Sequence, residues 1–261
     1  LQLPIEQVIE IAAGTGYKAI CMRASGVGIH SSAAERARVR DRVEGAGLAI
    51  AMVTADADIP LNNSQGPSSL RDIRPSVTLA RDLRCDLLRV CLKRREDIPF
   101  ARQAARIAGA EGVRLAHQCH THSLFEQVDP MLQVLAEIGD PNFGLIYEPA
   151  NLMLCGEPYG LETLQRLRPH VMNVYVQNHR LDPLGPVALD TYCLGTRRFH
   201  HLPLWSNDGV ALAEVVEGLR AIDYTGYFTI HQAEGLRSVN AAHSFAARCA
   251  AFVREAERSA S

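Results

Sequence analysis

The sequence predicts an α/β fold of the (β/α)8 TIM barrel class, formed by a single domain over residues 1–261. The first observation is that seven β-rich runs alternate with eight helical stretches, which is typical of parallel strands joined by crossover helices. The second is size, because 261 residues with 47% hydrophobic content suit one barrel of about 250 residues. A doubly wound open sheet is the alternative, but no G-x-G-x-x-G pattern follows a predicted strand.

The predicted strands and helices alternate along the whole chain. The strands cover residues 17–23, 47–54, 86–92, 113–119, 143–148, 171–177 and 227–232. The helices cover residues 4–14, 32–45, 69–84, 98–111, 126–138, 159–168, 209–222 and 239–257. Ser32, three residues before Glu35, and Asp208, before a run of helix formers, mark two helix starts. Pro75 is expected to kink the third helix or to shift its start.

Two features depart from a regular barrel. The chain opens on a helix, so we expect the first barrel strand to lie upstream of Leu1 or to be absent. A barrel without that strand has an open seam, which a second copy of the chain in a homo-oligomer would cover. The longest irregular stretch, residues 179–207, exceeds an ordinary barrel loop, and we expect it to be functional.

Composition narrows the class of protein. The formal net charge is −2, without the basic excess expected of a protein that binds nucleic acid or a membrane surface. No apolar run approaches the roughly 18–20 residues that span a bilayer. The seven cysteines are an odd number without a C-x-x-C pair, which favours reduced thiols in the cytoplasm over a disulfide scaffold.

Strand periodicity sorts the side chains into two faces. In a barrel, one face packs against the helices, and the other lines the interior that opens at the carboxyl ends of the strands. Apolar Phe228 and Ile230 mark the helix side of their strand, as do Met172, Val174 and Val176 of theirs. The side chains expected to form a ring at the barrel mouth are Arg23, Lys93, Gln118, Glu148, Tyr175, Gln177 and His231. The same alternation turns Arg89, Cys91 and Asn173 inward.

The segment VRLAHQCHTH (113–122) suggests a zinc site, because three histidines and a cysteine lie close together in the sequence. Apolar Leu115 shares its strand face with His117 and Cys119, so these two side chains point to the helices. Gln118 and His120 share the opposite face and point to the mouth. His117 and Cys119 therefore cannot join Gln118 and His120 in one metal site.

Four blocks carry a family resemblance: VRLAHQCHTH, GDPNFGLIYEPANLMLCGE (139–157), LRPHVMNVYVQNHR (167–180) and AIDYTGYFTIHQ (221–232). In order and spacing, they are similar to the xylose isomerase-like TIM barrel superfamily. That superfamily includes sugar phosphate isomerases and epimerases, keto-sugar 3-epimerases and the endonuclease IV group. The resemblance runs through most of the chain.

The resemblance implies a divalent metal held by strand-end Glu, Asp, His and Glu side chains, but all four positions differ in this chain. Gln118 replaces a carboxylate, Glu148 is a longer carboxylate, Tyr175 replaces an imidazole and His231 replaces a carboxylate. Mg²⁺ and Mn²⁺ prefer several oxygen ligands, whereas Zn²⁺ accepts Glu148 and His231 if a third strong ligand is added. Gln118, Glu148 and His231 are thus the metal candidates, and a site without metal is the other expectation. The candidates for a third zinc ligand are His120, His179, His200 and His201.

The function that the resemblance implies is a sugar or keto-sugar isomerase or epimerase, which transfers a proton next to a carbonyl. Glu148 would act as the general base and His231 as the acid or electrophile. The stretch 196–205 would close over the site, with Trp205 stacking on a sugar face. The expected substrate-binding residues are Arg23, Lys93, His120, Tyr175, Gln177, His179, His201 and Trp205.

Other functions remain open from the sequence. A lyase or dehydratase acting on a keto-sugar shares the proton-abstraction step with an isomerase. A non-catalytic barrel that binds a sugar or a partner protein would also explain the loss of the usual metal ligands. DNA repair needs a multinuclear zinc cluster and a basic groove, which the net charge of −2 and the altered ligands disfavour.

Overall fold

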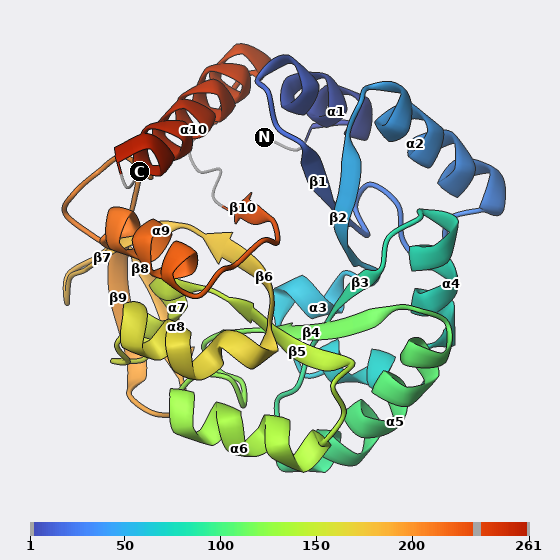
Figure 1. The fold of residues 1–261 in the computed structure, drawn as a ribbon, viewed down its shortest axis with the longest axis horizontal. Helices are drawn as coiled ribbons and strands as arrows, with labels where there is room; N and C mark the ends of the chain where they lie inside the picture. The colour runs from blue at the N-terminus through green and yellow to red at the C-terminus, as the bar shows by residue number, and fades with distance from the viewer. Residues whose placement is uncertain (1–2, 232–235, 260–261) are drawn as a thin grey trace.

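A computed structural model of the chain describes residues 3–231 and 236–259. Seven parallel strands form one curved sheet in the order β1-β2-β3-β4-β5-β6-β10, which gives a nearly closed barrel (Figure 1). The strands are β1 Ala19–Arg23, β2 Ala49–Thr54, β3 Leu87–Val90, β4 Arg114–Gln118, β5 Phe143–Tyr147, β6 Val171–Val176 and β10 Phe228–Ile230. The predicted α/β barrel and its seven strands are confirmed, although residue 232 of the strand predicted at 227–232 lies outside the described residues.

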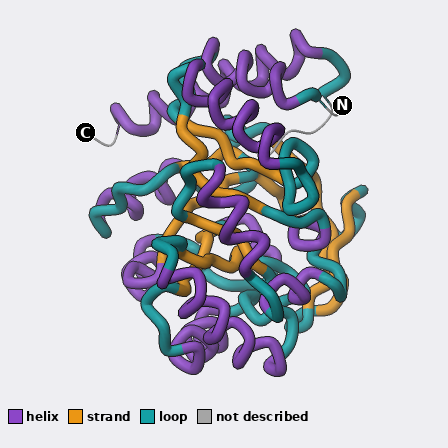
Figure 2. Tube along the Cα trace, turned by 90° about the vertical axis from the view of Figure 1, so that its right-hand side faces the viewer, coloured by secondary structure: helices purple, strands orange, loops and turns teal. Residues whose placement is uncertain are grey.

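Helices surround the strands (Figure 2). The main helices are α1 Ile5–Gly14, α2 Ala33–Gly45, α4 Arg74–Asp82, α5 Ile98–Ala110, α6 Val128–Ile138, α8 Leu161–Leu167, α9 Leu212–Ala221 and α10 Val239–Ser259. Shorter elements are α3 Asp58–Leu61, α7 Pro149–Leu154 and the 3-10 turns η1 Gly66–Leu70, η2 Arg95–Asp97 and η3 Arg168–His170. In the described part of the chain, no helix is long and apolar enough to cross a membrane.

Two of the three predictions about helix starts are confirmed. The Ser32 hydroxyl accepts the Glu35 amide and caps α2, as expected. Pro75 occupies the first turn of α4, where its missing amide hydrogen has no role, so the proline shifts the helix start rather than kinking it. The expectation for Asp208 is wrong, because α9 begins at Leu212, after Ala211 with a non-helical ψ of 73°.

The strands β1 and β10 lie at the two ends of the sheet, and we call the boundary between them the seam. Within the described residues, no backbone ladder joins these strands. Side chains contact each other across the seam instead: Cys21 Sγ lies 3.8 Å from Thr229 Oγ1, and Arg23 Nη2 lies 2.7 Å from His231 Nε2. The last contact places two predicted site residues from opposite ends of the chain side by side.

The stretch 179–207 is not irregular, contrary to the prediction. It contains most of a three-stranded antiparallel sheet in the order β7-β9-β8, with β7 Asn178–Leu181, β8 Val187–Thr191 and β9 Gly195–Leu202. The sheet pairs His179 with His201 and thereby brings two predicted site residues together.

The core has two compartments, as strand alternation requires. A large cluster fills the space between the barrel and the helices, and a small one lies inside the barrel and contains Met52, Leu87, Ala116, Ile146 and Tyr175. Met172 packs against the inner cluster, so its predicted helix-side position is wrong. The cause is an irregularity in the β5–β6 register, where Leu145 pairs with Val171 but Ile146 pairs with Asn173.

A buried carboxylate joins the hairpin between β8 and β9 to the barrel. The Glu126 carboxylate accepts backbone amides from Tyr192 at 2.8 Å, from Cys193 at 2.9 Å and from His122. Hydrogen bonds to a charged group are about twice as strong as neutral ones, and these amides lose their partner if the carboxylate is removed.

We therefore expect Glu126→Ala to lower the free energy of unfolding by about 1–3 kcal/mol, because three backbone amides lose their charged acceptor. The measurement is urea denaturation followed by circular dichroism. The matched control is Glu217→Ala, which removes an exposed carboxylate and should change stability by less than about 0.5 kcal/mol. Equal stability of the two variants would show that Glu126 does not anchor the hairpin.

Candidate active site

The centre of the candidate site is the carboxylate of Glu148, which follows β5 and begins α7. The side chain is fully buried, with 0% of its surface exposed. Burial of a charge is costly unless hydrogen bonds compensate it, so its partners determine its chemistry. We call Glu148 and its four donors, Gln118, Asn151, Gln177 and His231, the Glu148 cluster.

Four donors from four elements saturate this carboxylate. Oε1 accepts from Gln177 Nε2 after β6 and from His231 Nδ1 after β10, the latter at 3.4 Å. Oε2 accepts from Gln118 Nε2 at the end of β4 and from Asn151 Nδ2 in α7, the latter at 2.8 Å. A carboxylate offers about four lone-pair positions, and all of them are engaged here.

His231 connects the carboxylate to a cation. Nδ1 faces Glu148 and Nε2 lies 2.7 Å from Arg23 Nη2, a guanidinium nitrogen that can only donate. Nε2 must therefore accept, which places the ring proton on Nδ1 and makes the imidazole neutral. The ring also stacks on Tyr175, with centroids 4.3 Å apart. The result is a chain of three groups, a guanidinium, an imidazole and a carboxylate, which crosses the seam.

The pKa directions agree with this charge distribution. Burial is the largest influence on both groups, raising the pKa of Glu148 and lowering that of His231. For Glu148, the interactions with His231, His120 and Gln118 together outweigh burial and leave the pKa below its usual value. For His231, the contact with Glu148 only partly opposes burial, so the pKa stays below its usual value. At neutral pH, the pair is a carboxylate and a neutral imidazole.

Several other predicted residues lie beside this cluster without joining it. His120 Nδ1 donates to the Thr121 carbonyl at 2.8 Å and lies 3.3 Å from Asn62 Nδ2, and burial lowers the pKa of the imidazole to about 4. His179 is buried on β7, where its ring contacts those of Phe199 and His201 at 4.3 and 4.7 Å. In the described part of the chain, neither ring nitrogen of His179 finds a hydrogen-bond partner.

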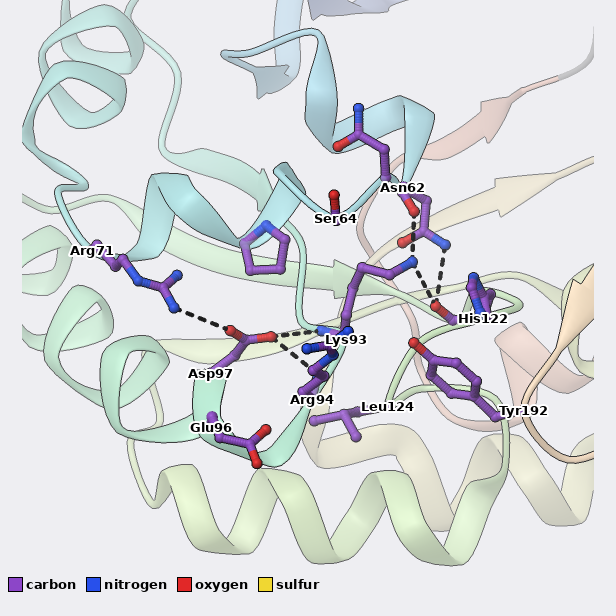
Figure 3. Close-up of a pocket in the computed structure, with 12 residues that line it drawn as sticks. Asn62, Ser64, Arg71, Lys93, Arg94, Glu96, Asp97, His122, Leu124 and Tyr192 are labelled. Atoms are coloured by element: carbon purple, nitrogen blue, oxygen red, sulfur yellow. Dashed lines mark hydrogen bonds and ion pairs between the residues drawn. The ribbon is translucent and has the colours of Figure 1, made fainter.

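Lys93 lines a separate cavity of about 690 Å³ (Figure 3). Its ammonium group donates to the carbonyl oxygens of Asn62 at 2.6 Å and His122 at 2.9 Å, which ties two loops together. Asp97 Oδ2 accepts the Lys93 amide at 3.0 Å in the same cavity. Among the described residues, no hydrogen bond or ion pair links Lys93 to the Glu148 cluster.

Trp205 packs against α10 rather than lying next to the Glu148 cluster. The Arg248 guanidinium lies 3.9 Å from the centre of its ring, and the Phe245 ring is 5.8 Å away. His200 pairs with Asp182 at 2.9 Å on the hairpin sheet. The stretch 196–205 is thus held by β9 and α10 in this structure.

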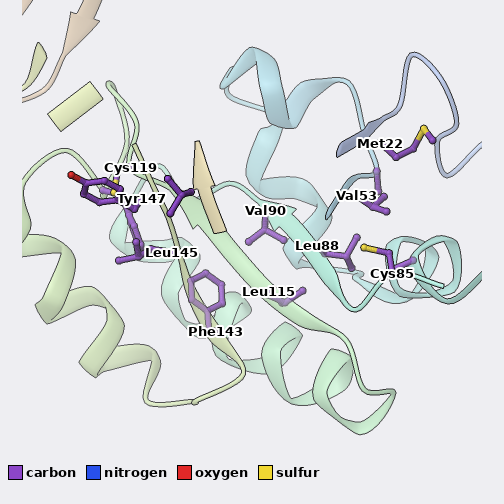
Figure 4. Close-up of a cluster of buried hydrophobic side chains, with 14 of the residues drawn as sticks. Met22, Val53, Cys85, Leu88, Val90, Leu115, Cys119, Phe143, Leu145 and Tyr147 are labelled. Carbon is purple, nitrogen blue, oxygen red and sulfur yellow. The ribbon is translucent and has the colours of Figure 1, made fainter. Parts of the chain in front are cut away.

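The segment 113–122 divides as the strand alternation predicts. Leu115 and Cys119 point to the helices with Leu145 and Tyr147 of the neighbouring strand (Figure 4). His117 lies on the same side, where Nδ1 contacts the Val90 carbonyl at 3.1 Å. Gln118 points to Glu148 on the other face.

Sequence reasoning missed Asn151 as a site residue. It stands three residues after Glu148 in a helix that Pro149 begins, and this spacing places both side chains on one face. A carboxylate at a strand end followed by an amide at the third helical position was the available signal.

Comparison with known proteins agrees with this architecture. The family model described as "Xylose isomerase-like TIM barrel" matches residues 9–247. The chain belongs to this family. No curated protein sequence matches it.

Solved structures share the barrel at low sequence identity. One is the probable 3-DHS dehydratase AsbF of Bacillus anthracis, with a TM-score of 0.72 and 16% identity over 94% of this chain and 93% of that one. D-psicose 3-epimerase, in the presence of D-fructose, gives 0.72 and 12% over 98% and 94%. A xylose isomerase-like barrel of Mycobacterium smegmatis, in complex with magnesium, gives 0.70 and 15% over 97% and 88%. These TM-scores show a common fold.

The Glu148 cluster of this family member does not fit the divalent metal that the family implies. Glu148 is its single anionic group, and amide nitrogens rather than oxygens face it from Gln118, Asn151 and Gln177. The Nε2 lone pair of His231 is directed at the cationic Arg23. Hard cations bind several oxygen ligands, and a nearby positive charge opposes them.

Another group of potential metal ligands lies outside the Glu148 cluster. Within residues 3–231 and 236–259, Glu126, Cys155 and Cys193 bring three metal-binding atoms within 4.8 Å of one another. None of these belongs to the Glu148 cluster, and the Glu126 oxygens already accept three backbone amides.

The buried histidines predict a pH-dependent stability. Burial lowers the pKa of His179 to about 3, below the usual value of about 6.5, so the unfolded chain binds its proton first. The stabilisation is complete above about pH 6.5 and is lost as the pH falls. We expect His179→Leu to lose less stability than the wild type between about pH 7 and pH 5, by up to about 2 kcal/mol. Urea denaturation at both pH values measures this, and equal losses would contradict a neutral His179.

Proposed function

We propose that this chain is an isomerase- or epimerase-type enzyme that moves a proton on the carbon next to the carbonyl of a keto-sugar derivative. The observation that carries the proposal is the Arg23–His231–Glu148 chain at the carboxyl ends of β1, β10 and β5. That end of the barrel holds the active site in this class of fold. The 3-epimerase among the fold neighbours supports the substrate class.

His231 is the general base in this proposal. Its Nδ1–H is directed at Glu148, so Nε2 is the atom that takes the proton. Glu148 orients the ring and stabilises the imidazolium that forms, as a carboxylate does for other catalytic histidines. Arg23 occupies Nε2 in the absence of substrate and has to turn away before proton transfer.

This proposal assigns the two roles differently from the expectation drawn from the sequence. Glu148 was the expected base, but a base needs a lone pair directed at the substrate, and four donors occupy its oxygens. Its depressed pKa also weakens it as a proton acceptor. Glu148 is a positioning residue that acts through His231.

A β-elimination is a second candidate, and the dehydratase among the fold neighbours favours it. The first step is the same, because His231 Nε2 removes the proton next to the carbonyl. The electron pair then expels a hydroxyl from the neighbouring carbon as water, which requires a proton donor, and leaves a conjugated enone. Ultraviolet absorbance of the product separates this outcome from isomerisation, which retains every atom of the substrate.

The test is exchange of the proton next to the carbonyl for deuterium, followed by NMR in heavy water over a panel of keto-sugars and keto-sugar acids. We expect His231→Asn to slow exchange by about 10²–10⁴-fold, because the base is removed. Glu148→Gln should lower the rate with a smaller effect on KM, because it acts through the imidazole. The exchange rate of the wild type should fall when acid protonates His231, and this fall should occur at a pH below the usual imidazole range, because the pKa of His231 is lowered.

The matched control is His243→Asn, which changes an exposed histidine of α10 and should leave the rate unchanged. Exchange that persists at the wild-type rate in His231→Asn would show that another group is the base.

A further inference from the structure

Three side chains on the neighbouring strands β1, β2 and β3 point into the barrel, and one of them, Arg23, contacts His231 of the Glu148 cluster. Arg23 of β1 pairs in register with Thr54 of β2. Val53 of β2 pairs with Leu88 of β3, which brings Thr54 next to Arg89. The alternation of strand side chains turns all three into the barrel.

Arg89 carries a buried positive charge. Only 3% of its surface is exposed, and Nε and Nη1 find no hydrogen-bond partner among the described residues. The Tyr175 ring lies near it, with its centre 5.9 Å from the guanidinium carbon, and the Glu148 carboxylate also acts on this charge. A buried guanidinium is retained at a cost unless an anion compensates it.

Two further polar atoms in the same region lack partners. Thr54 Oγ1 and Gln118 Oε1 are buried and make no hydrogen bond within the described residues. The Gln118 amide cannot turn this oxygen toward Glu148, because two oxygens would then face each other. Within the described residues, four buried polar atoms thus lack a hydrogen-bond partner, two on Arg89 and one each on Thr54 and Gln118, and a bound ligand would supply partners for them.

The charge of the site is positive. Arg23 and Arg89 contribute two positive charges, Glu148 contributes one negative charge, and His231 is neutral. Both guanidinium groups lower the pKa of His231, which shows that both charges act at this point. A field of this sign repels a metal cation and attracts an anion.

We infer that Arg23, Thr54 and Arg89 form a subsite for the anionic oxygen group of the substrate, a carboxylate or a phosphate ester. A guanidinium binds such groups through paired hydrogen bonds, and the Thr54 hydroxyl adds a donor. The inference rests on the proposed function, since it narrows the substrate class to anionic keto-sugar derivatives. Gln118 Oε1 would accept a substrate hydroxyl.

Anion binding and proton transfer are coupled through Arg23. In the unliganded site, Arg23 donates to His231 Nε2. An anion between Arg23 and Arg89 draws Arg23 away, and the Nε2 lone pair becomes available to the substrate carbon. A neutral sugar lacks the group that releases the base, so it should exchange its proton far more slowly.

The experiment measures thermal unfolding and calorimetric binding with inorganic phosphate, with glycolate as the carboxylate probe, and with sodium chloride at matched ionic strength. We expect one of the two oxyanions to raise the wild-type Tm beyond the chloride control, and the stronger one identifies the group. Arg89→Met should weaken that binding at least tenfold. Without an anion, Arg89→Met should be at least as stable as the wild type, because the unpaired buried charge is gone.

Two further variants keep the test decisive. Arg106→Met changes an exposed arginine of α5 and should bind as the wild type does. Thr54→Val keeps the side-chain shape and should weaken binding about threefold or more, which decides the question if Arg89→Met does not fold. No response to either oxyanion above the chloride control, or unchanged binding in Arg89→Met or in Thr54→Val, would overturn the inference.

The outcomes also separate this inference from the proposed function. Oxyanion binding that depends on Arg89, without deuterium exchange in any keto-sugar, would support the subsite and contradict the proposed reaction. Exchange of neutral keto-sugars that depends on His231 and is unaffected in Arg89→Met would support the reaction and contradict the subsite.

Discussion

The site depends on one interaction, the burial of a single carboxylate by four neutral donors. Glu148 is fully enclosed, and its charge persists because side chains from β4, α7, β6 and β10 each direct an N–H at it. Loss of one donor leaves a buried charge partly unsatisfied, at a cost of about 1–3 kcal/mol. The donors also tie together strands that are distant in the sequence. The Glu148 carboxylate thereby determines the geometry of the barrel mouth and the tautomer of His231.

The same interaction explains why the usual metal-ligand positions look so different in this family member. A metal surrounded by carboxylates supplies positive charge to a reacting oxygen. Here, amide hydrogens of Gln118, Asn151 and Gln177 stabilise the Glu148 carboxylate, and the positive charge resides on arginines. Arg23 contacts His231 directly, and Arg89 is buried. This distribution of charge is the basis of the proposed anionic substrate.

Much of this arrangement follows from period-2 alternation in the sequence. It places Gln118, Glu148 and His231 on one face and removes His117 and Cys119 from it. It fails at Met172, because a local register shift is invisible in a single strand. It also cannot separate Lys93, which turns into a neighbouring cavity, from the Glu148 cluster. The missing hydrogen-bond partners of Arg89 and Thr54 are a property of the packed structure, so no pattern in the sequence reveals them.

The protonation state of His231 tests the central claim most directly. Nitrogen-15 NMR of histidine-labelled protein near neutral pH, with His231 assigned through His231→Asn, distinguishes the two ring nitrogens by their chemical shifts. The structure predicts a neutral ring with the proton on Nδ1 and an acceptor Nε2 held by Arg23. A proton on Nε2 alone, or an imidazolium at neutral pH, would contradict the account, because neither form leaves a lone pair for Arg23 or for a substrate proton.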